Sequence, residues 1–267
     1  MQPTSNLYRD LLAELHAGKR NVRFESRLAI GDSGTLIDKG GNHITFGGER
    51  ILVDTGGPDA GYGEDMLIQD AMVIDLNVFP DSAPAVGQCI AGQIDVELML
   101  PVSEIPIKAR LVPYVRLTDG VRESEWIQQG VFYIDDRKLN PRRTFTTITL
   151  HGFDAMLKAQ ADYPATTVLS WPARDIDVVR EIARAMDVPL DARTVAGLDM
   201  GYLVEYPAQY SQQEVLGYIA AMYAGCFVIS PLGELLLIRI CDLPPETNHL
   251  VDAAGNAITF GGVRILV

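Results

Sequence analysis

The chain carries one of its segments twice. Residues 35–53, TLIDKGGNHITFGGERILV, recur as residues 249–267, HLVDAAGNAITFGGVRILV, with 13 of 19 positions identical and no gap. The distance between the two copies is too long for a stacked array of short repeats, which argues against a solenoid. A β-rich module that is repeated at two such distant places favours a part of an assembly over an enzyme whose chemistry lies in a single cleft.

Each copy is expected to fold as a β-meander. Gly47 and Gly48 accept the positive φ values of a two-residue turn, and β-branched and aromatic residues flank them. A second turn at residues 39–42 adds a third strand. Such a meander is too small to be stable alone, so it must pack on the body of the protein or on a neighbouring subunit. We expect Phe46 and Phe260 to be its matching anchors; a surface hairpin duplicated without consequence is the alternative.

The overall composition is that of an ordinary globular protein. Its 267 residues suffice for one large or two medium domains. The formal net charge of −13 and the scattered Lys and Arg residues argue against specific nucleic-acid binding. No apolar run reaches the roughly 18 residues that a membrane span needs, and the N-terminus lacks the basic and apolar regions of a signal peptide. We therefore expect a soluble protein without a membrane span.

A helix and then a series of strands are expected in the first part of the chain. Ser5 can cap a helix whose leucines share one face, and Gly18 closes that helix. From residue 23 to about residue 150, strand-like segments are separated by Pro, Gly, Asn and Asp. This pattern predicts an antiparallel barrel or sandwich. One strand alternates between a buried and a wetter face, the buried face being Ile94, Val96, Leu98 and Leu100. Another, within EWIQQGVFYID, is expected to carry Trp126, Val131, Phe132 and Tyr133.

Helical periodicity appears after Gly152. Residues 153–160 indicate a helical turn, and residues 173–186 form an amphipathic pattern with a clear core face. Ser211 to Glu214 is a capping box that opens a further helix, for which Gly225 is the expected left-handed C-cap. Two apolar segments around residues 231–233 then predict a β-hairpin.

The predicted fold class is therefore α+β. An N-terminal antiparallel β-barrel or sandwich, residues 1–163, contains the N-terminal helix and the inserted meander at 35–53. A small α/β domain follows at residues 164–240, and a C-terminal tail at 241–267 carries the second β-meander. The main boundary is placed near Pro164, where the chain breaks its helical turn. We expect Phe153, Met156 and Leu157 at the junction.

The motifs that could carry chemistry are weak. Residues 31–34, Gly-Asp-Ser-Gly, match the nucleophile segment of trypsin-like proteases but recur by chance, so a plain turn is favoured. Adjacent Asp135 and Asp136 on a strand should point to opposite faces and cannot act as an acid and base pair. The acidic stretch at 54–65 lacks the order of a calcium loop.

No pair of metal ligands has a recognisable spacing either. The four histidines do not place two on one helix face, and the cysteines, widely spaced in apolar sequence, are expected to be small core residues in a reducing compartment: Cys89, Cys226 and Cys241. We therefore expect no catalytic, cofactor-binding or metal-binding residues, and a protein that is not an enzyme.

An ordered set of segments resembles a known family. These segments are YRDLLAEL near the N-terminus, IPIKARLVPYVRL, SEWIQQGVFYIDDRK, ITLHGFDAMLKAQADYP and QYSQQEVLGYIAAMYAGCFVISPLGELLLIRI. Together they cover most of residues 5–240. The set resembles the tail hub, or distal tail-tip, proteins of prophages and contractile injection systems, which are similar to the baseplate hub of contractile phages.

The resemblance implies an architecture and a set of partners. The β domain would be tail-tube-like, and a homo-oligomer, expected to be a trimer, would join the tail tube or distal tail protein above to spike or fibre proteins below. The tape measure protein is a further possible neighbour. The protein would then belong to the virion tail, assembled in the cytoplasm of the bacterial host. Hubs of this family usually carry a second tube-like domain after the α/β part, which this sequence does not show. The acidic balance fits a lumen through which DNA slides without sticking.

Two other functions remain open from the sequence. A receptor- or carbohydrate-binding tail module would need an exposed cluster of aromatic residues, for which the candidates are Tyr202, Tyr206, Tyr210 and Tyr218. A tail-associated cell-wall hydrolase would need a carboxylate pair or a Cys-His pair in a groove, and the sequence offers neither at recognisable spacing.

Overall fold

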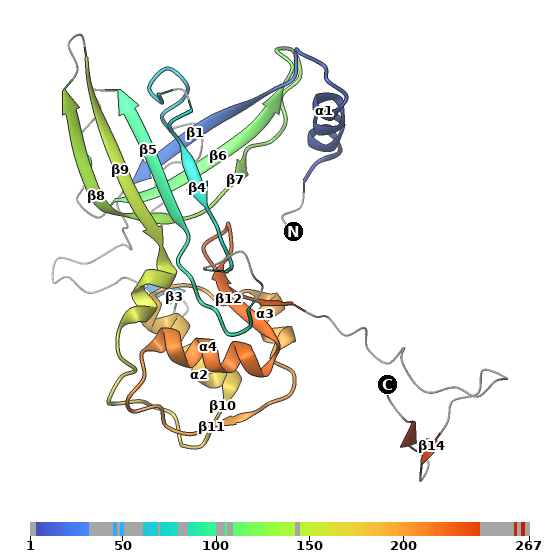
Figure 1. Ribbon diagram of the computed structural model, residues 1–267, viewed down its shortest axis with the longest axis vertical. Coiled ribbons are helices and arrows are strands. Elements are labelled where there is room, and N and C mark those ends of the chain that lie inside the picture. Colours follow the sequence, from blue (N-terminus) through green and yellow to red (C-terminus); the bar gives the residue numbers. More distant parts are fainter. Residues whose placement is uncertain are drawn as a thin grey trace.

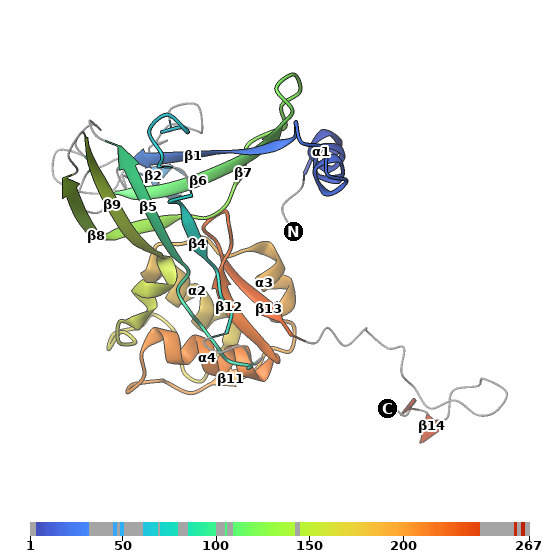
Figure 2. The same cartoon turned by 45° about the horizontal axis from the view of Figure 1, so that its top comes forward.

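The described part of the chain consists mainly of a curled antiparallel sheet and a smaller α/β unit (Figures 1 and 2). The computed structural model describes residues 4–31, 45–46, 49–50, 61–68, 70–79, 85–99, 105, 109–141, 145–240, 259–260 and 263–264. We call the sheet with its N-terminal helix the sheet module. The remainder, formed by residues 155–240 together with residues 85–91, is called the α/β module.

The sheet module is built almost entirely from neighbouring antiparallel strands. Its strand order is β1-β6-β8-β9-β5-β4, with β7 beside β6. The strands are β1 (Arg23–Gly31), β4 (Val73–Asp75), β5 (Gln93–Met99), β6 (Arg110–Thr118), β7 (Ile127–Gln128), β8 (Phe132–Pro141) and β9 (Thr146–Asp154). The prediction of a β-rich antiparallel domain is confirmed at this level, and the sheet curls as a half-barrel.

One face of this sheet forms a hydrophobic core. In β5 the predicted alternation is confirmed, because Ile94, Val96 and Leu98 are fully buried while the residues between them are partly exposed. Leu100 lies outside the described residues. The core also contains Leu28, Ile105, Ala109, Leu111, Phe132, Ile134, Ile148 and Leu150. The period of two in the sequence therefore places one side of every long strand in the interior.

The predicted strand EWIQQGVFYID is in fact divided. β7 pairs with β6 at Tyr114 and Val115, whereas β8 pairs with β6 at Arg110 and Leu111, with two residues of β6 between the two pairings. The break lies opposite Pro113, whose backbone has no N–H to donate but whose carbonyl accepts from Gln129. Trp126 therefore precedes β7, and only Phe132 and Tyr133 of the predicted residues lie in β8.

A β-bulge lies in β8 at Asp135 and Asp136. The register between β8 and β9 shifts between Ile134 and Asp136, so one extra residue is accommodated in β8. Both aspartates are exposed, as are the three residues that follow them in the strand. A period-two rule applies only while the ladder is regular.

The segment at residues 61–68 lies between β1 and β5. Leu28 of β1 and Tyr62 exchange backbone hydrogen bonds of 2.9 and 2.8 Å, and the N–H of Met99 in β5 donates to Met66 at 2.8 Å. This crossing covers part of the edge strand β1 and the end of β5 that lies beyond its pairing with β4, both of which would otherwise expose unpaired backbone groups.

The helix α1 (Asn6–His16) lies at the far end of the β1–β6 pair (Figure 1). The Ser5 hydroxyl accepts from the N–H of Tyr8, as an N-cap should, and Gly18 has the predicted positive φ of 80°. Leu11 is fully buried against Leu117 of β6. The helix is therefore docked on the sheet through a small core of its own.

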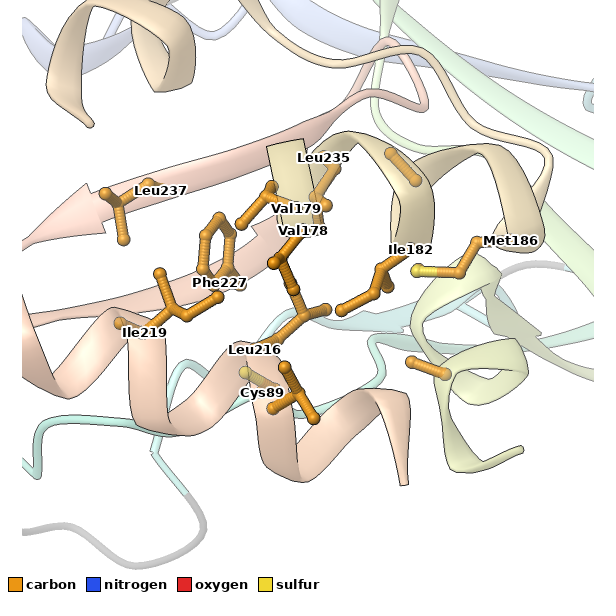
Figure 3. Close-up of a cluster of buried hydrophobic side chains, with 14 of the residues drawn as sticks. Cys89, Val178, Val179, Ile182, Met186, Leu216, Ile219, Phe227, Leu235 and Leu237 are labelled. Atoms are coloured by element: carbon orange, nitrogen blue, oxygen red, sulfur yellow. The ribbon is translucent and has the colours of Figure 1, made fainter. Parts of the chain in front are cut away.

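The α/β module has an enclosed core. Its elements are the 3₁₀ helix η2 (Ala155–Gln160), β10 (Ala173–Arg174), α2 (Asp175–Met186), α3 (Ala192–Gly197), β11 (Leu203–Val204), α4 (Gln212–Met222), β12 (Gly225–Ile229) and β13 (Leu235–Arg239). Figure 3 shows side chains from α2, α4 and the β12–β13 hairpin meeting around Phe227 and Leu216, both fully buried. The predicted amphipathic helix and hairpin are both present.

Local signals in this module are confirmed with one exception. Ser211 and Glu214 form the predicted capping box of α4, and Gly233 turns the hairpin with a φ of 85°. Gly225 is not the left-handed cap, because Ala224 has that conformation and Gly225 begins β12. A Cβ on Gly225 would lie 2.6 Å from the backbone oxygen of Ile238, so this glycine permits close approach of β13.

A segment from the first half of the chain packs in the α/β module. The N–H of Gly87 donates to Gly225, and Gln88 accepts from Phe227, so residues 87–88 lie beside β12. Cys89 belongs to the same core, where burial raises the pKa of its thiol to about 12. Cys89 and Cys226 are thus buried thiols, as expected, and Cys241 lies outside the described residues.

Both copies of the repeat contain the same short hairpin. In the first, β2 (Thr45–Phe46) pairs with β3 (Glu49–Arg50), and in the second, β14 (Thr259–Phe260) pairs with β15 (Val263–Arg264). The pairing register is the same in both, so the hairpin around each Gly-Gly pair is confirmed. The third strand of each predicted meander lies outside the described residues.

Candidate interaction surfaces

Several of the residues predicted to matter meet where the two modules join. Tyr133 of β8 and Phe153 of β9 are cross-strand partners at the end of the sheet. Tyr133 packs on the α/β core, and the ammonium of Lys158 lies 4.3 Å from the centre of its ring. Met156 is fully buried in that core, whereas Leu157 is partly exposed. Tyr133 therefore joins the end of the sheet to the α/β core.

Val131 makes a second contact across the junction. A Cβ on Gly233 would lie 3.0 Å from its side chain, so the β7–β8 connection touches the turn of the β12–β13 hairpin. Beside it, the side-chain amide of Gln128 donates to the carbonyl of Pro231 at 2.7 Å. Phe132, the next residue, points the other way into the sheet core.

A buried carboxyl group lies at the same junction. Asp154, the last residue of β9, caps η2 by accepting from the N–H of Met156 at 2.9 Å, and it accepts from Gly92 at 2.8 Å. Burial raises the pKa of Asp154 to about 7, against the opposing effect of these two donors. The carboxyl lines an apolar pocket of about 180 Å³ between the modules. Its protonation therefore bears on how the modules pack.

Trp126 lies away from this junction, next to the β1–β6 pair. Its ring is flanked by two guanidinium groups, with Arg116 at 4.5 Å and Arg27 at 5.1 Å from the ring centre. Arg116 also forms an ion pair of 2.7 Å with Glu25 on β1. The indole thus fastens neighbouring strands through cation–π contacts, which sequence reasoning about a barrel strand did not anticipate.

The outer face of α4 is apolar. Tyr218 is 57% exposed and Met222 is 40% exposed, and Tyr218 stacks edge-on with exposed Tyr210 at 5.3 Å between ring centres. A groove of about 430 Å³ runs beside this face and is lined in part by Val86, Gly87 and Ala221. In the sequence the signal is the charge-poor helix QQEVLGYIAAMYAG, in which apolar residues lie on the outer face as well as on the core face.

A second groove lies along β1. It has a volume of about 490 Å³ and lies between the first half of that strand and the segment at residues 64–72. Phe24, which lines it, is 47% exposed. Nothing in the hydrophobic periodicity of β1 predicted that one end of this strand would face an open groove.

The other two tyrosines considered for ligand binding stack on rings of the α/β module. Tyr206 stacks with Tyr163 and Trp171, and its hydroxyl donates to the carbonyl of Pro164 at 3.1 Å. Tyr202 stacks on Tyr223 at 5.4 Å but is still 37% exposed. Of the four candidates, Tyr210 and Tyr218 are the exposed rings that stack on each other.

The groups considered for chemistry are dispersed. His151 lies 2.7 Å from Asp95 on the neighbouring strand, and His16 ends α1. Within the described ranges no group of three or more His, Cys, Asp or Glu side chains could hold a metal ion. No helix in this part of the chain is long and apolar enough to cross a membrane. Residues 32–34 of the protease-like motif, Phe46 and Phe260 have no described side chains.

Comparison with known proteins gives matches at the level of structure. No family model and no curated protein sequence matches the chain. The 43 kDa tail protein of prophage MuSo2 from Shewanella oneidensis matches with a TM-score of 0.50 and 11% identity, covering 82% of this chain and 56% of that protein. A tail protein from Neisseria meningitidis MC58 matches with a TM-score of 0.46 and 11% identity, covering 88% and 53%. The chain thus spans about half the length of these proteins. Over most of its own length, its fold is similar to that of a prophage tail protein.

Proposed function

We propose that the chain is a structural component of a phage-like tail. The observation that carries this proposal is the likeness of its fold to the prophage MuSo2 tail protein over 82% of the chain. Because one fold can serve several functions, the proposal also depends on a feature of the surface of the molecule. The apolar outer face of α4 is typical of a surface that another subunit covers.

Within such a tail, we assign the chain to the hub at the distal end. A homo-oligomer, expected to be a trimer, would join the tail tube to the spike or fibre proteins and leave a channel for DNA. The ordered segments that resemble tail hub proteins support this position, and so does the acidic net charge of −13, which would keep DNA from adhering to the channel wall. The proposed role is assembly and not catalysis.

A receptor- or carbohydrate-binding module is the weaker alternative. Tyr210 and Tyr218 form an exposed aromatic pair, which is the feature that this alternative needs. Exposed Met222 lies on the same helix as Tyr218. A surface that combines Tyr rings with an apolar Met side chain is more typical of a contact with a protein than of a contact with a sugar.

Two measurements test the proposal. Size exclusion with light scattering should give a mass near three times 29.2 kDa. Deleting the gene in a strain that produces the tail, followed by electron microscopy, should remove intact tails, and an antibody against the restored protein should label the distal tip. Normal tails without the gene would refute a structural role, whereas label elsewhere along the tail would refute the hub position alone.

A further inference from the structure

One wall of the groove beside β1 is a strand edge to which none of the described residues pairs over half of its length. β1 pairs with β6 along its whole length, and on its other edge Leu28 exchanges hydrogen bonds with Tyr62. Backbone groups alternate along a strand, so Phe24 and Ser26 point their N–H and C=O groups to the same edge as Leu28. In the described part of the chain, no backbone partner faces these two residues on that edge. As far as the described residues go, half of the edge therefore has no paired strand.

The floor of the groove is an exposed continuation of the sheet core. The side chains of Phe24, Ser26 and Leu28 share one face of β1, and Leu28 is fully buried while Phe24 is 47% exposed. Leu67, Ile68 and Met72 supply the apolar opposite wall. A free edge next to apolar side chains is the arrangement to which an added β-strand binds, through main-chain hydrogen bonds and side-chain contacts.

The rim of the groove is acidic. Glu64 and Asp70 both line it and are exposed. An occupant should therefore combine β-forming, apolar residues with a positive charge and should lack acidic side chains near its strands.

We propose that the occupant is the C-terminal repeat hairpin of a neighbouring copy, centred on β14–β15. Residues 258–267, ITFGGVRILV, are apolar and β-prone, and they contain one Arg and no acidic residue. The first copy of the repeat has Glu49 where the second has Val263, so its hairpin carries no net charge and fits an acidic rim less well. Phe260 and Arg264 would supply the ring for the apolar floor and the guanidinium for the rim.

The connection is long enough for exchange between subunits. Eighteen residues separate Ile240, where the α/β module ends, from Thr259, and such a segment spans up to roughly 60 Å when extended. The assignment to a neighbouring copy, in place of the same chain, rests on the proposed ring of subunits. The result would be a ring in which each hairpin extends the sheet of the next subunit.

Peptide binding tests the groove directly. A fluorescent peptide of residues 249–267 should bind saturably to a chain that lacks these residues, measured by anisotropy. The three buried clusters include no residue beyond Leu237, so this truncation leaves them intact. Ser26→Pro should abolish binding, because it removes an N–H on the open edge. Glu64→Lys with Asp70→Lys, both exposed, should weaken it roughly tenfold.

Matched controls distinguish binding in the groove from nonspecific binding of the peptide. Glu205→Lys, at an exposed acid of the α/β module, should leave binding unchanged. A peptide with Phe260→Ser and Arg264→Glu should not bind. Absence of binding by the parent peptide, or binding that survives the double Lys variant, would overturn the proposal.

Light scattering of the full chain and of the truncated chain tests whether the hairpin of one copy binds to the groove of another copy. We expect the full chain to be oligomeric and truncation to lower its mass. The proposed exchange between copies would be overturned if the groove bound the peptide but the full chain stayed monomeric at every concentration. This outcome is distinct from failure of the tail function, which is read from whether tails form without the gene.

Discussion

The two hydrophobic cores of the molecule differ in how they are closed. The α/β core is surrounded by α2, α4, η2 and the β12–β13 hairpin, and Phe227 at its centre is fully buried (Figure 3). The sheet core is equally buried at Leu28 and Leu98 but opens at Phe24, where none of the described residues pairs with the strand edge. The first core is complete within its own module, whereas the second ends at a surface that another strand could cover.

The α/β core also contains a buried carboxyl group with several hydrogen-bond partners. Asp175 is fully buried, and its carboxylate accepts from the N–H of Ile176 at 2.7 Å, from that of Tyr202 at 3.2 Å and from the hydroxyl of Tyr223 at 2.5 Å. Burial, followed by the hydrogen bond to this carboxylate, raises the pKa of Tyr223. A buried carboxyl group is tolerated only with such partners, so these three donors stabilise Asp175 inside the core.

The largest expected effect compares the same residue type in the two cores. Phe227→Ala should lower the free energy of unfolding by about 3–5 kcal/mol, because it leaves a cavity in an enclosed core. Phe24→Ala, at the open groove, should cost about 1 kcal/mol or less. Urea denaturation monitored by circular dichroism measures both. Equal losses would mean that the sheet core is as closed as the α/β core.

Removal of one hydroxyl tests the buried polar network. Tyr223→Phe should cost about 1.5–3 kcal/mol, since it takes a hydrogen bond from a buried carboxylate. Tyr218→Phe, the same change at an exposed ring five residues earlier, should leave stability unchanged. The comparison uses the same denaturation assay. If both variants lost similar stability, the Asp175 network would not be what holds α2 to α4.

The junction between the cores should respond to pH through Asp154. Its pKa is raised from 3.8 to about 7 by burial, so the folded protein retains a proton that the unfolded chain loses first. The contribution of this group to stability is therefore fully present below about pH 4 and declines as pH rises to about 7. The stability advantage of the parent over Asp154→Asn should shrink across this window in urea titrations. An advantage that grows with pH would show that Gly92 and Met156 hold the carboxylate ionised.

The smallest effect on stability is expected on the outer face of α4. Tyr218→Ser with Met222→Ser should change the free energy of unfolding by no more than about 0.5 kcal/mol, because both side chains are exposed. The same variant should lower the mass measured by light scattering if α4 contacts a neighbouring subunit. The matched control is Arg180→Ser with Arg184→Ser on the charged outer face of α2, which should affect neither quantity. An unchanged mass in both variants would remove α4 from the interface.

Local sequence signals predicted much of the α/β module. Ser211 with Glu214 marked the start of α4, and the periodicity of α2 identified Val179, Ile182 and Met186 as buried. The prediction of a left-handed C-cap at Gly225 was wrong, because a glycine after a helix is compatible both with such a cap and with close approach of a neighbouring strand. The choice between these roles depends on β13, which is ten residues further along the chain.

The candidate surfaces were harder to predict than the cores. Trp126, Val131 and Phe132 were assigned to one strand, yet they face two arginines, a hairpin turn and the sheet core respectively. Sequence patterns report which side chains avoid water, and they do not report which distant segment covers them. For the same reason the sequence did not predict the open edge at Phe24, which depends on how β1, Tyr62 and residues 64–72 lie relative to one another.

The sequence alone determined the elements whose causes are local: the capped helices, the alternating strands, the glycine hairpin of each repeat and the acidic, dispersed charge. Tertiary structure decided the division of one strand opposite Pro113, the burial of Asp154 between modules and the groove along β1. These features arise from contacts between residues far apart in the chain. Short-range propensity carries no information about such contacts, because their energies come from burial and from hydrogen bonds that form only when the segments meet.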